Sequence, residues 1–219
     1  MNPRVAHRKT AALTVMEVLV SIGVLLVLAS LTISISNSRQ RHDWRRKLSC
    51  EINLRQVGVE FRSWEIDYND KYPMQVSVTN GGAMELAATG NAIAVFQVMS
   101  NELSTPKIVV CPQDVDREFA TNFTTDFNNS RVSYFVNADG DADNPQTLLA
   151  GDSNFEVNSV RVKSGLLRLS SNAPASWTAA RHRFSGYLLF GDGSVQGMNN
   201  AGLSNYFNAG SWTNRLAIP

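Results

Sequence analysis

The segment Leu13–Ser38 reads LTVMEVLVSIGVLLVLASLTISISNS and is the strongest indication of the fold. Its one charged residue is Glu17, close to its start. An ionised carboxylate at membrane depth costs about 2.5–3.5 kcal/mol on insertion scales, and such residues are rare without a partner or a role. A simple hydrophobic anchor has no use for this acid, so the position of Glu17 indicates a function beyond anchoring.

A short basic leader precedes this stretch and contains no acid, while its basic residues are Arg4, His7, Arg8 and Lys9. Together with Ala12, Leu13 and Glu17, it resembles the cleavage and methylation segment of bacterial type IV prepilins and type II secretion pseudopilins. In that family a small residue, usually Gly, ends the leader, and a Glu stands at the fifth mature position. Here Ala12 takes the place of the Gly, and Leu13 takes the place of the usual Phe.

The resemblance implies that a prepilin peptidase cuts between Ala12 and Leu13 and that the new amine of Leu13 is N-methylated. Glu17 then lies about one helical turn from this amine, which has a pKa near ~8 and is largely cationic at neutral pH. The resemblance also implies that Glu17 of an incoming subunit meets the amine of a docked subunit and helps to set filament register. The implied partners are the peptidase, other pilin or pseudopilin subunits, an inner-membrane assembly platform and the lipid bilayer.

As a helix, residues 18–38 would extend roughly 30 Å at ~1.5 Å per residue, which is enough for one membrane crossing. We therefore expect residues 13–38 to form a transmembrane and filament-core helix in the inner (cytoplasmic) membrane, with the large domain in the periplasm. Basic residues flank both ends, and their count alone favours the opposite orientation. The chosen orientation rests on the resemblance. A secretory signal peptide cleaved near Ser36 is an alternative.

Helical periodicity continues after this stretch, through an amphipathic stem that spans residues 39–68. One apolar stripe with spacings of three and four residues runs along it: Cys50, Leu54, Val57, Phe61, Trp64 and Tyr68. Asn69, Asp70 and Pro73 then supply residues typical of a helix end and a turn. The stripe is expected to pack on a sheet.

Residues 73–219 form the expected globular sheet domain. Residues 107–111, 131–136 and 147–150 are predicted strands, and residues 186–196 are a predicted hairpin around Asp192-Gly193. A short helix is expected after residues 89–91. The predicted fold class is α+β, with a long N-terminal transmembrane helix that continues as an amphipathic stem packed on an antiparallel sheet, as in pilins. The domain limits are therefore 1–12 for the leader, 13–38, 39–68 and 73–219.

Four aspartates are candidate metal ligands, because calcium prefers several oxygen ligands: Asp139, Asp141, Asp143 and Asp152. Their spacing does not match an EF-hand, and an acidic solvated turn is the preferred interpretation. Cys50 and Cys111 are the two cysteines. They can pair in an oxidising compartment, and two free thiols are the equal alternative. The three histidines have no spaced partner, so neither a metal nor a general-base role is expected for them.

The sequence contains no motif of a nucleophile elbow, a zinc protease or a nucleotide-binding loop. The net charge of +1 gives no argument for a nucleic-acid partner. We therefore expect a structural subunit rather than an enzyme, without a cofactor apart from the candidate calcium. It would polymerise through its N-terminal helix into the pseudopilus of a type II secretion system or into a type IV pilus. Two alternatives stay open: a single-pass anchored periplasmic binding domain that does not polymerise, and an exported enzyme with a cleaved signal peptide.

Overall fold

The computed structural model describes residues 14–170, 173–209 and 214–219, and for residues 32–43 it describes the backbone without the side chains. The chain divides into two units, Met1–Arg45 and Arg46–Pro219. The predicted leader over residues 1–12 lies outside the described residues, as does Leu13.

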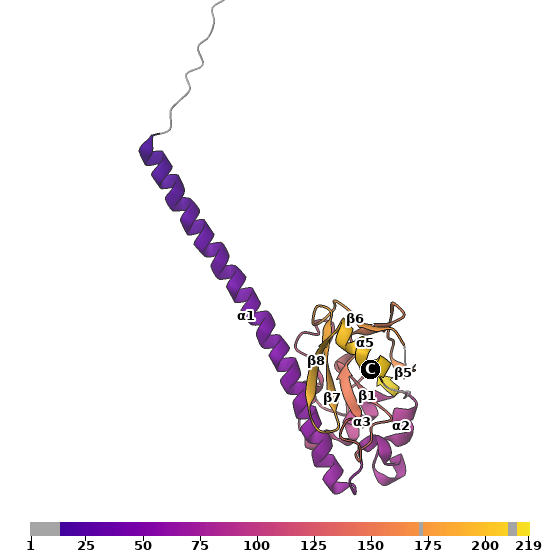
Figure 1. Ribbon diagram of the computed structural model, residues 1–219. Helices are drawn as coiled ribbons and strands as arrows, with labels where there is room; N and C mark the ends of the chain where they lie inside the picture. Colours follow the sequence, from indigo (N-terminus) through magenta and orange to yellow (C-terminus); the bar gives the residue numbers. More distant parts are fainter. Residues whose placement is uncertain (1–13, 171–172, 210–213) are drawn as a thin grey trace, which may run out of the picture. The chain divides into compact units, whose positions relative to one another are not determined.

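The longest element is helix α1 (Val15–Asp67), which contains residues of both units (Figure 1). It ends just before Asn69 and Asp70, which both adopt a left-handed backbone with φ of 55°. Asn and Asp enter this conformation more readily than other residues that carry a Cβ. The predicted helix end near Asp67 is therefore confirmed.

Among the described residues, no helix is long and apolar enough to cross a membrane. The prediction of a transmembrane helix over residues 13–38 is therefore wrong, and so is the predicted single-pass location in the inner membrane. The uncharged run of α1 whose side chains are described extends from Val18 to Leu31, which is about 20 Å of helix at ~1.5 Å per residue, whereas the hydrocarbon core is about 30 Å thick. Glu17 precedes this run, and polar residues alternate with Ile along residues 32–36 that follow it.

The second half of α1 packs on a sheet through the predicted stripe. Cys50, Leu54, Val57 and Phe61 are fully buried, and Trp64 is 1% exposed. The helix lies close to the sheet at Gly58, where a Cβ atom would lie 2.6 Å from Cδ1 of Leu189. Glycine costs roughly 1 kcal/mol inside a helix, and here it allows the backbone of α1 to lie against a strand.

The main sheet has six antiparallel strands in the order β5-β9-β1-β2-β7-β8. These strands are β1 (Tyr134–Asn137), β2 (Leu148–Asp152), β5 (Gly165–Leu169), β7 (Ser185–Phe190), β8 (Val195–Asn199) and β9 (Asn214–Ile218). The predicted hairpin forms between β7 and β8. Strand β9, from the end of the chain, lies between β5 and β1.

The two faces of this sheet face two different cores. Tyr134, Val136 and Leu189 belong to the core that contains the stripe of α1. Their chain neighbours Phe135 and Leu188 belong to a second core. This alternation follows from the period of two in a strand, and it gives the sheet an apolar layer on each side.

The second core is closed by helix α5 (Asn200–Ala209) and by a small sheet. The small sheet has the order β4-β3-β6 and consists of β3 (Phe155–Val157), β4 (Val160–Arg161) and β6 (Ala175–Trp177). Helix α5 lies beside β6 (Figure 1), where the backbone N–H of Trp177 donates a hydrogen bond to Oδ1 of Asn200 at 2.7 Å. The sequence did not predict this second layer.

Short helices occupy the segment between α1 and β1: η1 (Pro73–Gln75), η2 (Val78–Asn80), α2 (Met84–Ala88), α3 (Ala92–Val98), α4 (Ser100–Leu103), η3 (Pro106–Val109) and η4 (Asn129–Arg131). Helix α3 confirms the helix expected after residues 89–91.

The strand predicted over residues 107–111 is wrong, because most of that stretch forms η3. Thr105 caps η3 through its hydroxyl, which accepts from the N–H of Lys107 at 3.4 Å, and Pro106 opens the helix. Both residues favour a helix start and outweigh the β-branched residues that follow.

Candidate functional site

Glu17 lies in the first turn of α1 and is exposed. Its Oε2 accepts hydrogen bonds from the backbone N–H of Thr14 at 2.9 Å and from the Thr14 hydroxyl at 3.0 Å. In return, the backbone N–H of Glu17 donates to Oγ1 of Thr14 at 3.3 Å. This reciprocal arrangement is a capping box. The backbone and side-chain hydrogen bonds from Thr14 lower the pKa of Glu17, so the carboxylate is ionised at neutral pH and stabilises the helix start.

The capping box was readable in the sequence, since a Thr followed three residues later by a Glu before an apolar run is a helix-start signature. The prediction assigned Glu17 to assembly alone and missed Thr14. Ala12 and Leu13, between which cleavage was predicted, lie outside the described residues.

Beyond Glu17, the first part of α1 has exposed apolar side chains on every side of the helix. Their exposed fractions range from 43% at Val18 to 77% at Val15. The exposed large apolar residues are Val15, Met16, Val18, Leu19, Val20, Ile22, Val24, Leu25, Leu26, Val27, Leu28 and Leu31. Monomeric soluble proteins rarely expose contiguous apolar patches above a few hundred Å². We call these residues the apolar collar, and its exposure indicates a surface that another molecule covers.

The four aspartates predicted as metal ligands do not come together. Asp139 forms an ion pair with Arg215 at 2.6 Å, and Asp141 accepts a hydrogen bond from Gln75 at 2.9 Å. Asp143 is exposed, whereas Asp152 lies in β2 and is fully buried. Within the part of the chain that the structure describes, the only group of three or more His, Cys, Asp or Glu residues close enough to hold one metal ion lies elsewhere, at Cys50, Cys111 and His182.

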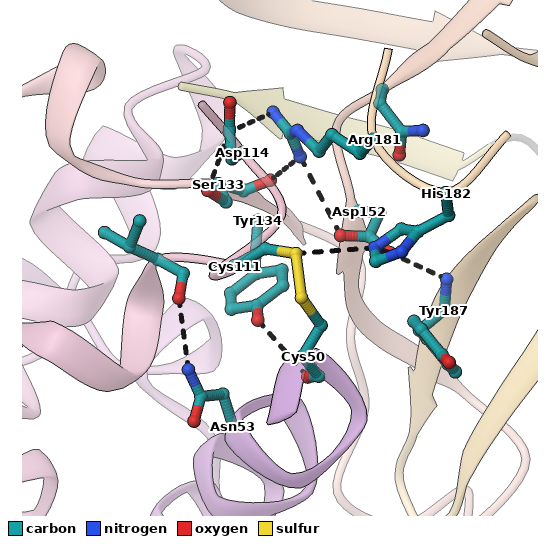
Figure 2. The surroundings of a disulfide bond; sticks show 12 residues. Cys50, Asn53, Cys111, Asp114, Ser133, Tyr134, Asp152, Arg181, His182 and Tyr187 are labelled. Carbon is teal, nitrogen blue, oxygen red and sulfur yellow. Dashed lines mark hydrogen bonds and ion pairs between the residues drawn. A yellow bond between two sulfur atoms is a disulfide. The ribbon is translucent and has the colours of Figure 1, made fainter. Parts of the chain in front are cut away.

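Cys50 and Cys111, whose pairing the sequence left open, form a disulfide. Both are fully buried, and their Cα atoms are 4.8 Å apart. Cys50 belongs to α1 and Cys111 follows η3, so the bond joins the stem to the segment before β1. Two hydrogen bonds flank it (Figure 2): Asn53 Nδ2 donates to the carbonyl of Val110 at 3.1 Å, and the Tyr134 hydroxyl donates to the carbonyl of Cys50 at 3.3 Å.

A buried charged cluster lies beside this disulfide (Figure 2). Arg181 binds Asp114 at 2.7 Å and approaches Asp152 at 3.8 Å. Nε2 of His182 lies 3.2 Å from Oδ2 of Asp152 and 3.4 Å from Sγ of Cys111. The side chains of these residues are at most 7% exposed, a depth at which charged groups persist when they are paired.

The sequence reasoning missed this cluster because its members are distant along the chain. His182 and Cys111 are 71 residues apart, and no spacing motif connects them. The pairing of β2 with β7 places Asp152 near the loop that precedes β7, and this loop brings the histidine to the disulfide.

Comparison of the chain with models of protein families, with curated proteins and with solved structures gives no match. The resemblance to prepilins and pseudopilins therefore rests on the residues of the sequence alone. A functional assignment depends on two features of the described chain: the apolar collar with its capping acid, and the cross-linked stem with its buried charged cluster.

Proposed function

We propose that this protein is a filament subunit that assembles through the apolar collar of α1, as do the type IV pilins and pseudopilins that its N-terminal sequence resembles. The exposure of the collar is the observation that carries the proposal. Full burial of one Val, Leu, Ile or Met side chain contributes about 1.5–3 kcal/mol, so burial of about six of them contributes about 9–18 kcal/mol. That gain is comparable to or larger than the free-energy cost of association, ~4–15 kcal/mol, which arises from lost translational and rotational entropy.

In this proposal, Glu17 also determines how neighbouring helices align. A prepilin peptidase cuts between Ala12 and Leu13 and methylates the new amine, which stays cationic. Both hydrogen bonds that Glu17 accepts from Thr14 go to Oε2. Its other oxygen, Oε1, then accepts the amine of a neighbouring copy. An ion pair screened from water by the surrounding collars is stronger than the same pair at an exposed surface.

The second half of α1 has a different role in this proposal. Its buried stripe and the Cys50–Cys111 bond attach the sheet domain to the assembling helix, so each copy adds one sheet domain to the filament surface. The proposal assigns no catalytic residue.

Intact-mass measurement of the protein isolated from cells that produce it tests the processing step. The expected mass is that of a chain that has lost Met1–Ala12 and carries one added methyl group. Material that keeps its leader, or that loses residues through Ser36, contradicts the proposal.

Two matched variants separate the charge of Glu17 from its capping role. Glu17→Gln removes the charge and keeps the capping box, because Gln also serves at this position. Thr14→Ala removes the cap and keeps the charge. We expect Glu17→Gln to be processed and helical but not to form filaments in negative-stain electron microscopy, and Thr14→Ala to form them. If Glu17→Gln forms normal filaments, the charge of Glu17 has no role in assembly and the residue acts only as a helix cap.

A further inference from the structure

The disulfide lies within a group of atoms that resembles a metal-binding site. Sγ of Cys50, Sγ of Cys111 and a ring nitrogen of His182 all lie within 4.8 Å of one another, and the three residues are at most 1% exposed. Asp152 adds a carboxylate oxygen 3.2 Å from Nε2 of His182 (Figure 2). Two sulfurs, one imidazole nitrogen and one carboxylate oxygen are all ligands that zinc accepts.

Two of the distances between these atoms are close to the edges of a zinc tetrahedron. With Zn–S of about 2.3 Å and Zn–N and Zn–O of about 2.0–2.2 Å, a tetrahedral site has S···N edges of about 3.5 Å and N···O edges of about 3.4 Å. The observed Cys111 Sγ to His182 Nε2 distance is 3.4 Å, and His182 Nε2 to Asp152 Oδ2 is 3.2 Å. The two sulfurs are too close, because they are bonded to each other, whereas a zinc site requires them about 3.8 Å apart. Sγ of Cys50 lies within 4.8 Å of the imidazole, so it must move when the bond is reduced.

We infer that Cys50, Cys111, His182 and Asp152 form a zinc-binding site when the disulfide is reduced. Two molecules of an external thiol reduce the bond by thiol–disulfide exchange: they supply the two electrons and two protons, become a disulfide themselves, and leave two protein thiols. Zinc binding then releases both protons and leaves two thiolates, a neutral imidazole and a carboxylate around the ion. The S–S bond breaks in the first step, and two Zn–S bonds form in the second.

The surrounding charges favour an ion at this position. Two thiolates, the carboxylate of Asp152 and Zn²⁺ sum to one negative charge, and the guanidinium of Arg181 lies between this group and Asp114, 3.8 Å from Oδ1 of Asp152 and 2.7 Å from Oδ2 of Asp114. This Oδ1 is buried and has no hydrogen-bond partner in the structure, while Oδ2 accepts from the backbone N–H of Tyr187 at 2.9 Å. Asp152 is therefore oriented by the sheet and has spare capacity as a ligand, which a metal site needs from its surroundings.

The consequence is a stem that is cross-linked in both oxidation states. The disulfide joins α1 to the segment after η3 under oxidising conditions, and zinc joins the same two segments under reducing conditions. In a chain that folds before its cysteines are oxidised, zinc would thus already attach the sheet domain to α1. This inference does not depend on filament assembly.

Refolding of the reduced full-length chain tests the site. The protein is unfolded in urea with a water-soluble phosphine, which is oxidised to the phosphine oxide while water supplies the oxygen and the two thiol protons. It is then refolded with Zn²⁺ or with a chelator. We expect native mass spectrometry to show one zinc per reduced chain and none on the oxidised chain. Replacement of zinc by Cd²⁺ should produce the ultraviolet charge-transfer absorption of thiolate-bound cadmium.

Matched variants assign the ligands. Cys50→Ser with Cys111→Ser should abolish stoichiometric binding, and His182→Gln should weaken it at least tenfold. His42→Gln makes the same chemical change at a histidine that the site does not use and should leave binding unchanged. If the reduced chain folds only in zinc, its far-ultraviolet circular dichroism should recover on zinc addition. A reduced chain that binds no zinc at tenfold excess, or that stays unfolded with it, overturns the inference, as does equal binding by the double serine variant.

Discussion

The two halves of helix α1 are both rich in apolar residues, but they present them differently. From Val15 to Leu31 the apolar side chains surround the helix and are exposed, whereas from Cys50 to Trp64 they form one stripe that is buried. A stripe with a period of three to four residues needs a partner on one side only, and the sheet supplies it within the same chain. A helix that is apolar all round needs cover on every side. The period of the apolar pattern, rather than its hydrophobicity, therefore indicates whether the partner lies inside or outside the chain.

The largest effect is expected from removal of the cross-link in the second half. The disulfide closes a loop with a sequence separation of 61, and a loop of that length corresponds to about 4 kcal/mol in the chain-entropy description. Cys50→Ala with Cys111→Ala should lower the free energy of unfolding by about this amount in urea denaturation followed by tryptophan fluorescence. A loss under about 1 kcal/mol would show that the buried stripe holds the stem without help from the bond.

Replacing one leucine in each half of α1 by alanine compares how much each half contributes to the free energy of unfolding. Leu54 is fully buried and Leu25 is 64% exposed. Leu54→Ala should destabilise the unassembled chain by about 2–5 kcal/mol, whereas Leu25→Ala should change the free energy of unfolding by less than about 0.5 kcal/mol. Urea denaturation of dilute protein measures both. Similar losses in the two variants would mean that the collar is covered within the single chain, against the present account.

A pair of glycines sharpens the same contrast. A Cβ at Gly58 would lie 2.6 Å from the Leu189 side chain, whereas a Cβ at Gly23 would meet nothing within 4 Å. Gly58→Ala should destabilise by up to about 2 kcal/mol, since overpacking of roughly 1–3 kcal/mol exceeds the ~1 kcal/mol gain in helix propensity. Gly23→Ala keeps the gain alone and should raise helix content in circular dichroism. Equal stabilisation by both would place α1 farther from β7 than the structure does.

The smallest effect concerns two glutamates whose pKa values shift in opposite directions. Hydrogen bonds from Thr14 lower the pKa of Glu17. Burial is the main cause that raises the pKa of Glu60, and the nearby charge of Glu102 raises it further. The stability that Glu17 contributes is therefore present above its unfolded-state pKa and is lost as the pH falls through its lowered pKa. Glu60 has the opposite sign: its protonated form is favoured on folding, so stability falls as the pH rises from the unfolded-state pKa through the raised one.

Nuclear magnetic resonance of the carboxyl carbons checks this order in one titration. The midpoint of Glu17 should lie below the ordinary 4.5 and that of Glu60 above it. Thr14→Ala serves as the control and should move the midpoint of Glu17 back toward the ordinary value while leaving Glu60 in place. If the two midpoints coincide in the wild type, the hydrogen bonds from Thr14 do not lower the pKa of Glu17, which contradicts the capping box.

Local patterns predicted the parts of the fold that depend on neighbouring residues. The stripe from Cys50 to Trp64, the helix end at Asp67 and the β7–β8 hairpin each follow from spacing or turn chemistry within a few residues. Strand β9 could not be placed in this way, because its partners β1 and β5 are far along the chain and only the closed core determines their order.

The same limit explains the candidate sites. The disulfide depends on how η3 meets α1, and the position of His182 depends on the pairing of β2 with β7, so neither has a sequence signal of its own. Thr14 did have a signal, the Thr-x-x-Glu spacing. The assembly role predicted for Glu17 considers only a lipid environment, for which no helix among the described residues is long and apolar enough.

Photo-cross-linking in cells that produce the protein tests the central claim, that copies meet through the apolar collar. The photoreactive residue p-benzoylphenylalanine replaces Leu25 in one variant and Val115, which is 79% exposed in the sheet domain unit, in another. The account predicts a ladder of covalent multimers of this chain after illumination at position 25 and monomers at position 115. Monomers at position 25, or equal ladders at both positions, would contradict it.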